Sequence, residues 1–137
     1  MHIELKRSGA PFHFEAKNEG GKTVQLDAAE EIGGTDKGAR PMELFIMGLG
    51  GCTAIDVVMI LEKQKQVIND FDIKIDADRK KEGDASLFSK INIEYILKGQ
   101  VDEEKLKRAI ELSLNKYCSA AKTLEKTAEI TYTYKVN

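Results

Sequence analysis

Two cysteines are the side chains of this sequence best suited to chemistry. Cys52 follows a run of glycines inside the apolar stretch from Pro41 to Lys65, and Cys118 directly precedes Ser119. A thiolate is both a nucleophile and a metal ligand. Two cysteines are too few for a disulfide scaffold, so in a reducing compartment they indicate either buried thiols or a redox pair. The cysteine count leaves both interpretations open.

The stretch that contains Cys52 predicts a helix that is buried on most sides. Apolar residues between Leu44 and Leu61 occur almost all the way round a helical wheel. Pro41 suits a first helical turn, so we expect the helix to begin near position 41. The glycines at 48, 50 and 51 each cost about 1 kcal/mol relative to alanine in a helix, which favours a place where another backbone or a ligand approaches closely.

The second cysteine is expected at the start of a short helix. Asp102 is a good N-cap for a preceding helix, whose predicted buried stripe consists of Leu106, Ile110, Leu114 and Tyr117. Ser119 would cap a further short helix that runs through Glu125. A thiol at or just before a helix N-terminus is favoured in its thiolate form, so Cys118 gains nucleophilic character from this position.

The rest of the chain predicts strands and turns. Apolar and polar residues alternate in segments at 2–7, 11–16, 24–26, 71–77, 91–97 and 130–136. The first three segments predict one sheet of about three strands, and those at 71–77 and 91–97 predict a long hairpin. A glycine-rich loop at 28–40 leads directly to the central helix. We therefore expect a single α+β domain over residues 1–137.

Composition and charge limit the kinds of partner and the cellular compartment that we expect for this protein. The net charge is -2, with lysines and glutamates interleaved, so neither nucleic acid nor a membrane surface is indicated. The N-terminus lacks the apolar core of a signal peptide, and three glycines with Thr53 and Asp56 interrupt the central helix, which argues against a membrane span. A cytoplasmic protein is expected. His2 and His13 lie far from the cysteines in sequence, so neither a metal nor a cofactor is expected.

Two motifs carry a resemblance to a known family. The first motif is RPMEL at 40–44, GLGGCT at 48–53, DVV at 56–58 and ILEK at 60–63, and the second is YCS at 117–119 before KTL at 122–124. Together they resemble the OsmC/Ohr family, the osmotically induced and organic-hydroperoxide-resistance proteins. The order of elements agrees over the whole chain.

The resemblance implies an OsmC-like fold, in which antiparallel sheets wrap around the buried central helices of an intertwined homodimer. It also implies a peroxiredoxin-like activity in the stress response, the reduction of organic hydroperoxides. By motif position Cys52 would be the attacking thiol and Cys118 the resolving thiol, and an external thiol reductant would reopen their disulfide. A homodimer is also expected from the residues themselves, because one small domain cannot easily cover every face of the central helix.

The sequence departs from the family at one position. Where the hydroperoxide-resistance branch has a glutamate directly after the proline, this chain has Met42, and the acid is Glu43. A shift of one residue turns a side chain by about 100 degrees around a helix, so Glu43 does not simply inherit that role. Arg40 precedes Cys52 by roughly 18 Å along a straight helix. Arg7, or an arginine of a partner subunit, therefore competes with Arg40 as the candidate thiolate-stabilising group.

A second feature weakens the chemistry at Cys52. Asp56 lies one turn beyond Cys52 on the same helix face, and an unpaired carboxylate disfavours a neighbouring thiolate. The alternative function is a non-catalytic protein of the same fold, whose interface binds a small apolar or thiol-bearing ligand. In that case Cys52 is a small core residue. The choice between these functions, the oxidant and the reductant stay open at this point.

Overall fold

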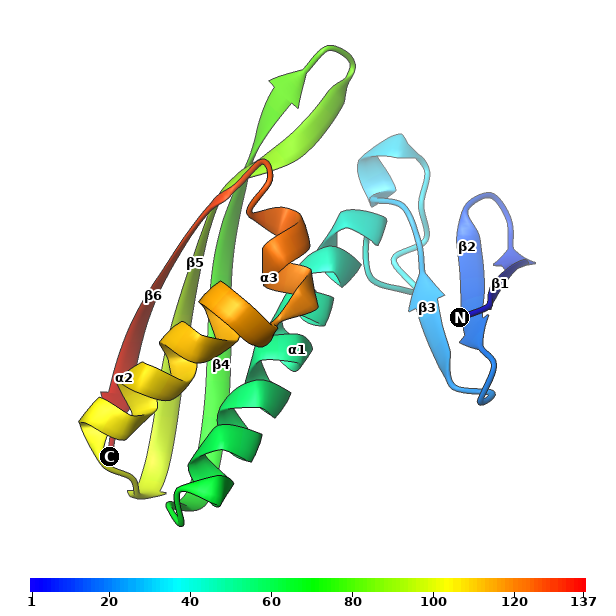
Figure 1. Cartoon of the computed structure of the whole chain (residues 1–137). Coiled ribbons are helices and arrows are strands. Elements are labelled where there is room, and N and C mark those ends of the chain that lie inside the picture. The colour runs from blue at the N-terminus through cyan, green and yellow to red at the C-terminus, as the bar shows by residue number, and fades with distance from the viewer. The chain divides into compact units, whose positions relative to one another are not determined.

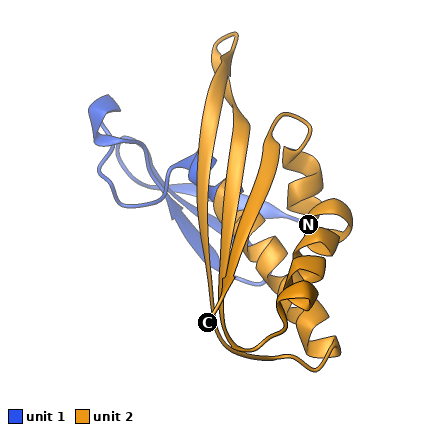
Figure 2. Cartoon of the chain, turned by 90° about the vertical axis from the view of Figure 1, so that its left-hand side faces the viewer, with its two compact units in different colours: residues 1–45 blue, residues 46–137 orange.

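The computed structural model describes residues 1–137, which form two compact units (Figure 2). Unit 1 comprises residues 1–45 and unit 2 comprises residues 46–137. The boundary lies inside helix α1 (Pro41–Lys63), so the same helix ends unit 1 and begins unit 2. The expectation of a single domain stays a prediction.

Unit 1 contains a small antiparallel sheet. Its strands are β1 (Ile3–Gly9), β2 (His13–Asn18) and β3 (Thr23–Leu26), in the order β1-β2-β3. The predicted hairpin and third strand are thus confirmed, with boundaries shifted by one to two residues. The register changes between Arg7 and Gly9, where the chain enters the turn.

The loop after β3 is organised by one buried carboxylate. Asp27 is only 1% exposed and accepts hydrogen bonds from Ala28 N at 2.7 Å, Thr35 N at 3.2 Å, Thr35 Oγ1 at 2.6 Å and Lys37 N at 3.1 Å. The hydrogen bond from the Thr35 hydroxyl, with those from the three amides, lowers the pKa of Asp27 to about 2 although burial opposes the shift. A short 3-10 turn, η1 (Glu30–Ile32), lies within this loop.

Unit 2 is a three-stranded sheet with helices on one face (Figure 1). Its strands are β4 (Val67–Glu82), β5 (Ala85–Gln100) and β6 (Glu129–Val136), in the order β4-β5-β6. The strands β4 and β5 form the predicted antiparallel hairpin, and both are longer than the alternating pattern indicated. The strand β6 runs parallel to β5, so this sheet is mixed, whereas the resemblance implied antiparallel sheets.

The parallel pairing of β6 is explained by the helical crossover that precedes it. The connection consists of α2 (Glu103–Leu112), the π-helical turn η2 (Ser113–Tyr117) and α3 (Ser119–Leu124). A parallel neighbour requires such a long connection across one face of the sheet. The predicted cap of α2 is confirmed, because Lys105 N donates a hydrogen bond to Asp102 Oδ1 at 3.0 Å.

The core of unit 2 lies between the sheet and its helices. Alternate side chains of β5 are completely or almost completely buried, namely Ile91, Ile93, Tyr95 and Leu97. They share this core with residues one turn apart on α1, namely Leu49, Thr53, Val57 and Leu61. Leu106, Ile110 and Leu114 are also buried, as predicted.

One prediction about helix burial needs correction. Tyr117 was expected in the buried stripe after α2, but 52% of it is exposed. It is the last residue of the wider π-helical turn η2, in which the angular spacing of an α-helix no longer applies. Within one chain the central helix is covered on one face only, since Met47, Ile55 and Met59 are each at least half exposed, and its burial on most sides stays a prediction that requires a second copy.

The length and composition of α1 would allow it to cross a membrane. Core helices of water-soluble proteins satisfy the same criterion. In this structure Thr53 and Asp56 of α1 form buried or half-buried hydrogen bonds with groups of unit 2.

Candidate functional site

The two cysteines meet within unit 2. Cys52 lies on α1, and Cys118 lies between η2 and α3. Their sulfur atoms and a carboxylate oxygen of Asp56 all lie within 4.8 Å of one another. Both cysteines are free thiols, Cys52 half-buried and Cys118 fully buried. The fold therefore brings together the two residues that the sequence analysis singled out, and it adds Asp56 to them.

The surroundings of Cys118 oppose its ionisation. Its sulfur accepts a hydrogen bond from Ala121 N at 3.3 Å, so Cys118 is itself the N-cap of α3, in place of the predicted Ser119. Burial, followed by the hydrogen bond to Cys52, raises the pKa of Cys118 to about 12, and the charge of Asp56 adds to this shift. The prediction that its helix-terminal position favours a thiolate is therefore wrong, because burial outweighs the single amide hydrogen bond.

A chain of buried hydroxyl groups ends on Asp56. Tyr95 Oη lies 2.8 Å from Thr53 Oγ1, Thr53 Oγ1 lies 2.8 Å from Ser113 Oγ, and Ser113 Oγ donates to Asp56 Oδ2 at 2.9 Å. An ionised carboxylate only accepts, so Ser113 must give its proton to Asp56. Ser113 then accepts from Thr53, and Thr53 accepts from Tyr95. All three hydroxyl groups thus donate in the direction of Asp56.

Asp56 forms no ion pair with a lysine or arginine in this structure. Its negative charge therefore acts on the neighbouring sulfur atoms without a compensating cation from an ion pair. At Cys118 this charge adds a small contribution to the rise in pKa that burial causes, whereas the expected effect of Asp56 on Cys52 stays a prediction.

The other candidate residues belong to unit 1. Arg40 donates from its guanidinium to Asp36 Oδ1 at 2.9 Å and to the carbonyl of Gly38 at 3.1 Å. The backbone amide of Arg40 donates to Glu43 Oε1 at 2.7 Å, which is half of a capping box at the start of α1. Arg7 is an exposed residue of β1. In this structure Arg40 and Glu43 are thus engaged in contacts that define the start of the helix.

The sequence analysis did not identify Ser113, which links Thr53 to Asp56 in the hydroxyl chain. Ser113 begins η2, directly after α2, where it continues the buried stripe of Leu106 and Ile110 and is fully buried. A serine in an otherwise apolar stripe is the signal that could have identified it, because a buried hydroxyl requires a hydrogen-bond partner. Tyr95 is the equivalent case on β5, a hydroxyl within a run of isoleucine and leucine.

The glycines before Cys52 differ in what they face. A Cβ atom on Gly50 would lie 3.2 Å from Ile75 Cδ1, whereas one on Gly48 or Gly51 would have nothing within 4 Å. Within one chain Gly50 is thus approached closely by a side chain, and the expected approach of a backbone or a ligand to these glycines stays a prediction. A shallow apolar pocket lies between α1 and β4, lined by Ile46, Met47, Gly50, Gly51, Ala54, Phe71, Ile73 and Ile75.

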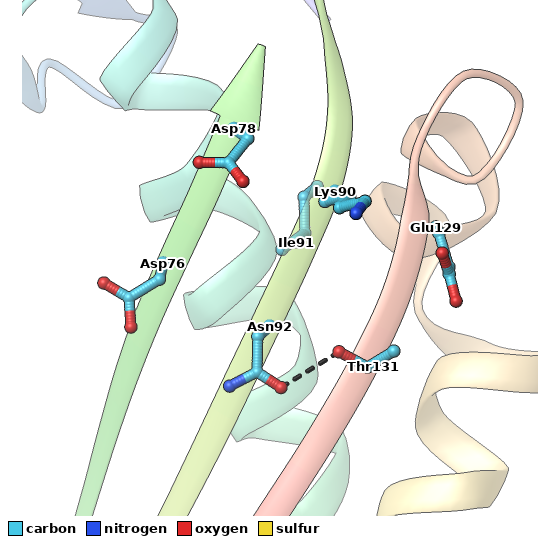
Figure 3. Close-up of a pocket in the computed structure, with 7 residues that line it drawn as sticks. All are labelled: Asp76, Asp78, Lys90, Ile91, Asn92, Glu129 and Thr131. Carbon is cyan, nitrogen blue, oxygen red and sulfur yellow. Dashed lines mark hydrogen bonds between the residues drawn. The ribbon is translucent and has the colours of Figure 1, made fainter.

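A second pocket lies on the sheet face away from the helices (Figure 3). It is lined by Asp76, Asp78, Lys90, Ile91, Asn92, Glu129 and Thr131. One hydrogen bond joins these side chains, from Thr131 Oγ1 to Asn92 Oδ1 at 2.9 Å. The pocket contains no thiol and no histidine, so the cysteine pair remains the candidate for chemistry.

Comparisons with known proteins agree with this geometry. Residues 34–133 match the family model of OsmC-like proteins. Protein YhfA of Escherichia coli K12 is 43% identical over 102 residues, which cover 74% of this chain and 75% of that protein. A solved hypothetical protein of Aquifex aeolicus superposes with a TM-score of 0.85 at 29% identity, covering 99% of this chain and 95% of that one.

A more distant structure carries a functional name. The organic hydroperoxide resistance protein of Elizabethkingia anophelis superposes with a TM-score of 0.76 at 17% identity, covering 100% of this chain and 97% of that one. At this identity the likeness establishes the fold alone. The family match spans most of the chain, including both cysteines and the hydroxyl chain that ends on Asp56. The protein therefore belongs to the OsmC-like family.

Proposed function

We propose that this protein is a thiol-dependent peroxidase that reduces organic hydroperoxides, with Cys52 as the attacking and Cys118 as the resolving residue. The observation that carries the proposal is the placement of the two sulfur atoms within 4.8 Å of each other. A solved structure named an organic hydroperoxide resistance protein shares the fold. Two adjacent free thiols are what a peroxidase needs to cleave a peroxide and then protect itself from further oxidation.

The reaction balances with two thiols and one external reductant. The Cys52 thiolate attacks one peroxide oxygen, an S–O bond forms, the O–O bond breaks and the alcohol leaves with a proton. The Cys118 thiol gives up its proton and attacks the resulting sulfenic acid, which forms the disulfide and releases water. Two equivalents of an external thiol then reduce the disulfide. The cytoplasm, where the protein is expected, supplies such thiols.

The environments of the two sulfurs support this division of roles. Cys52 is half-buried, so a peroxide has access to it, whereas Cys118 is fully buried. The raised pKa of Cys118 keeps its proton in place, and its hydrogen bond with Cys52 can then run from the Cys118 thiol to the Cys52 sulfur. Cys52 is therefore the sulfur that a peroxide meets first, which suits the attacking role proposed for it.

The peroxidase proposal includes a homodimer. Met47, Ile55 and Met59 expose apolar side chains on α1, and an apolar pocket adjoins Gly51. A second copy that packs against this face would bury it, as the sequence analysis expects for the central helix. The organic part of the hydroperoxide would bind in the same apolar surroundings, and Arg7, Arg40 or Glu43 would act from unit 1 of either chain.

The second candidate function is a non-catalytic protein that binds a small apolar or thiol-bearing ligand. One observation favours it: Asp56, which has no ion-pair partner, stands beside the thiols. The charge of Asp56 adds to the raised pKa of Cys118 and so opposes the formation of a thiolate there.

Thiol counting with cumene hydroperoxide distinguishes the two functions. One equivalent of peroxide should consume both thiols of the wild-type protein together. Cys52→Ser should consume no peroxide, and Cys118→Ser should react once and gain one oxygen on Cys52, measured by mass spectrometry. An unmodified Cys52 and unconsumed peroxide in the reduced wild type would exclude the peroxidase and favour the ligand-binding protein.

A further inference from the structure

The two thiols of the candidate redox pair and the neighbouring carboxylate also have the composition of a metal-binding site. Cys52 Sγ, Cys118 Sγ and a carboxylate oxygen of Asp56 lie within 4.8 Å of one another, and all three residues are buried or half-buried. From this juxtaposition we infer that the reduced protein binds one soft divalent cation, typified by Zn²⁺, through Cys52, Asp56 and Cys118. This goes beyond the proposed peroxidase, since it concerns the thiols in the absence of any peroxide.

The spacing of the ligand atoms suits a tetrahedral ion. Zn–S bonds of about 2.3 Å and Zn–O bonds of about 2.0–2.2 Å place neighbouring ligand atoms roughly 3.5–3.8 Å apart. The observed atoms lie within 4.8 Å, so each needs to move by less than about 1 Å to reach this geometry. Two ligands, Cys52 and Asp56, come from successive turns of α1, which holds them at a fixed spacing.

The carboxylate is held in place by a second set of contacts. Ser113 Oγ donates to Asp56 Oδ2 at 2.9 Å, and Thr53 and Tyr95 continue the hydrogen-bond chain into the core. Carboxylates that bind metal ions are themselves hydrogen-bonded in this way, because the outer contact fixes their orientation. The hydroxyl chain therefore orients one oxygen of Asp56 and leaves acceptor capacity for an ion.

Charge points to a cation in the same place. Asp56 forms no ion pair with a lysine or arginine, and the two thiols become thiolates as the ion takes the place of their protons, so the binding ligand set carries three negative charges. A divalent ion compensates most of this charge and binds sulfur ligands more readily than Mg²⁺ or Ca²⁺ do. Binding exchanges the two thiol protons for the ion and releases both protons to solvent.

Three protein ligands leave a fourth tetrahedral position for water or a small anion. This arrangement is typical of open zinc sites, whereas structural sites use four protein ligands. The sequence analysis expected no metal because it considered ligand spacing along the chain, and Cys118 lies far from Cys52 in sequence. Bound metal and the Cys52–Cys118 disulfide exclude each other, because both use the same two sulfur atoms.

Cobalt is a suitable probe, because Co²⁺ replaces Zn²⁺ and gives a sulfur-to-cobalt charge-transfer band only when thiolates bind it. The reduced full-length protein is titrated with Co²⁺ under argon. We expect that band to saturate at one ion per chain and to disappear when Zn²⁺ is added. Cobalt bound by His2, His13 or surface carboxylates gives no such band, so its absence would overturn the inference.

Variants test each ligand separately. Asp56→Asn keeps an acceptor for Ser113 but removes the charged ligand, and should weaken Co²⁺ binding roughly 10-fold or more. Cys52→Ser and Cys118→Ser should each reduce the charge-transfer intensity and the affinity further. The matched control is Asp76→Asn on the exposed face of β4, which should leave binding unchanged. Unchanged affinity in Asp56→Asn, with circular dichroism showing a folded protein, would overturn the three-ligand assignment.

Failure of the metal site and failure of the peroxidase remain distinguishable. The cobalt titration contains no peroxide, and the thiol count with cumene hydroperoxide contains a chelator and no metal. If both activities are present, saturating Zn²⁺ should slow thiol oxidation by peroxide, and a chelator should restore it. Oxidation at an undiminished rate in the presence of bound Zn²⁺ would contradict binding through Cys52 and Cys118.

Discussion

Asp27 in unit 1 and Asp56 in unit 2 are both withdrawn from solvent, but their surroundings use the two carboxylates differently. Asp27 accepts four hydrogen bonds, three of them from backbone amides, and all its partners lie within one loop. Asp56 accepts one hydrogen bond, from Ser113, and its remaining neighbours include two thiols. An ionised carboxylate has about four acceptor positions. The four hydrogen bonds to Asp27 occupy these acceptor positions, whereas Asp56 keeps acceptor positions that no donor occupies.

The comparison indicates that Asp27 has a structural role, whereas Asp56 is placed to take part in chemistry. The hydrogen bonds to Asp27 lower its pKa to about 2 and fix the loop that leads to α1. The remaining acceptor capacity of Asp56 faces sulfur atoms, where it can influence a proton or bind an ion. The two residues differ less in their burial than in the number of their hydrogen-bond donors and in whether those donors are backbone amides or a side-chain hydroxyl.

The largest effect on stability is expected from Asp27→Ala. This change leaves the amides of Ala28, Thr35 and Lys37 without their acceptor, and we expect Tm to fall by several degrees in thermal unfolding. The wild type should also lose stability as pH falls from about 4 toward 2, because Asp27 has an ordinary pKa of 3.8 and a folded pKa of about 2. A variant as stable as the wild type at pH 7 would contradict this structural role.

An opposite pH dependence is expected from Cys118. Its pKa is raised from 9.0 to about 12 in the folded protein, so its stabilising contribution is present below pH 9 and is lost as pH rises toward 12. Tyr132, with a pKa raised to about 12 by burial and by Glu111, acts in the same range. Urea unfolding of reduced wild type and Cys118→Ser between pH 8 and about 11 should show a flatter alkaline decline in the variant. Equal declines would contradict a protonated, buried Cys118.

A smaller loss of stability is expected from Ser113→Ala. The change removes the donor to Asp56 and the acceptor for Thr53, so the free energy of unfolding should fall by about 1–3 kcal/mol. The control is Ser119→Ala at the exposed start of α3, which should change stability much less. In contrast to Asp27→Ala, this variant should also alter the rate at which Cys52 reacts with a thiol reagent. A change in stability without any change in that rate would assign Ser113 to packing alone.

The smallest effect concerns the α1 face that one chain leaves exposed. Gly51→Leu should gain about 1 kcal/mol from helix propensity if this face is free, since nothing lies within 4 Å of the added Cβ. If a second copy covers it, overpacking should instead cost about 1–3 kcal/mol. Gly83→Leu is the reference, because Gly83 has φ +65 in an exposed turn and should lose about 1 kcal/mol. We expect Gly51→Leu to be the more destabilised variant in urea, and a stabilised one would argue against the homodimer.

The sequence predicted those parts of the fold that depend on local periodicity. The start of α1 at Pro41, the cap at Asp102 and the alternation along β5 follow from side-chain pattern and capping chemistry. The parallel pairing of β6 and the exposure of Tyr117 depend instead on a crossover and a π-helical turn. Neither feature leaves a clear pattern in the residues that form it.

The candidate site was predicted only in part for a similar reason. Both cysteines could be identified from residue type and motif, and Asp56 from its place one turn beyond Cys52. That Cys118 is too buried to ionise readily, and that Ser113 links Asp56 to Thr53, depend on contacts between α1, η2 and β5. Such contacts join residues that are far apart in sequence. The position of Cys118 at a helix terminus can be predicted from the sequence, but its burial cannot.

The fixed direction of the hydroxyl chain has a consequence for which substitutions this protein should tolerate. Tyr95 only donates at the far end of the chain, so a phenylalanine there leaves a lone pair on Thr53 unused, a mild loss. A substitution of Thr53 or Ser113 interrupts the chain and strands a donor or acceptor. Tolerance of substitution should therefore decrease from Tyr95 toward Asp56. Once Asp56 is lost, the hydroxyl groups should become dispensable one after another, beginning with that of Ser113.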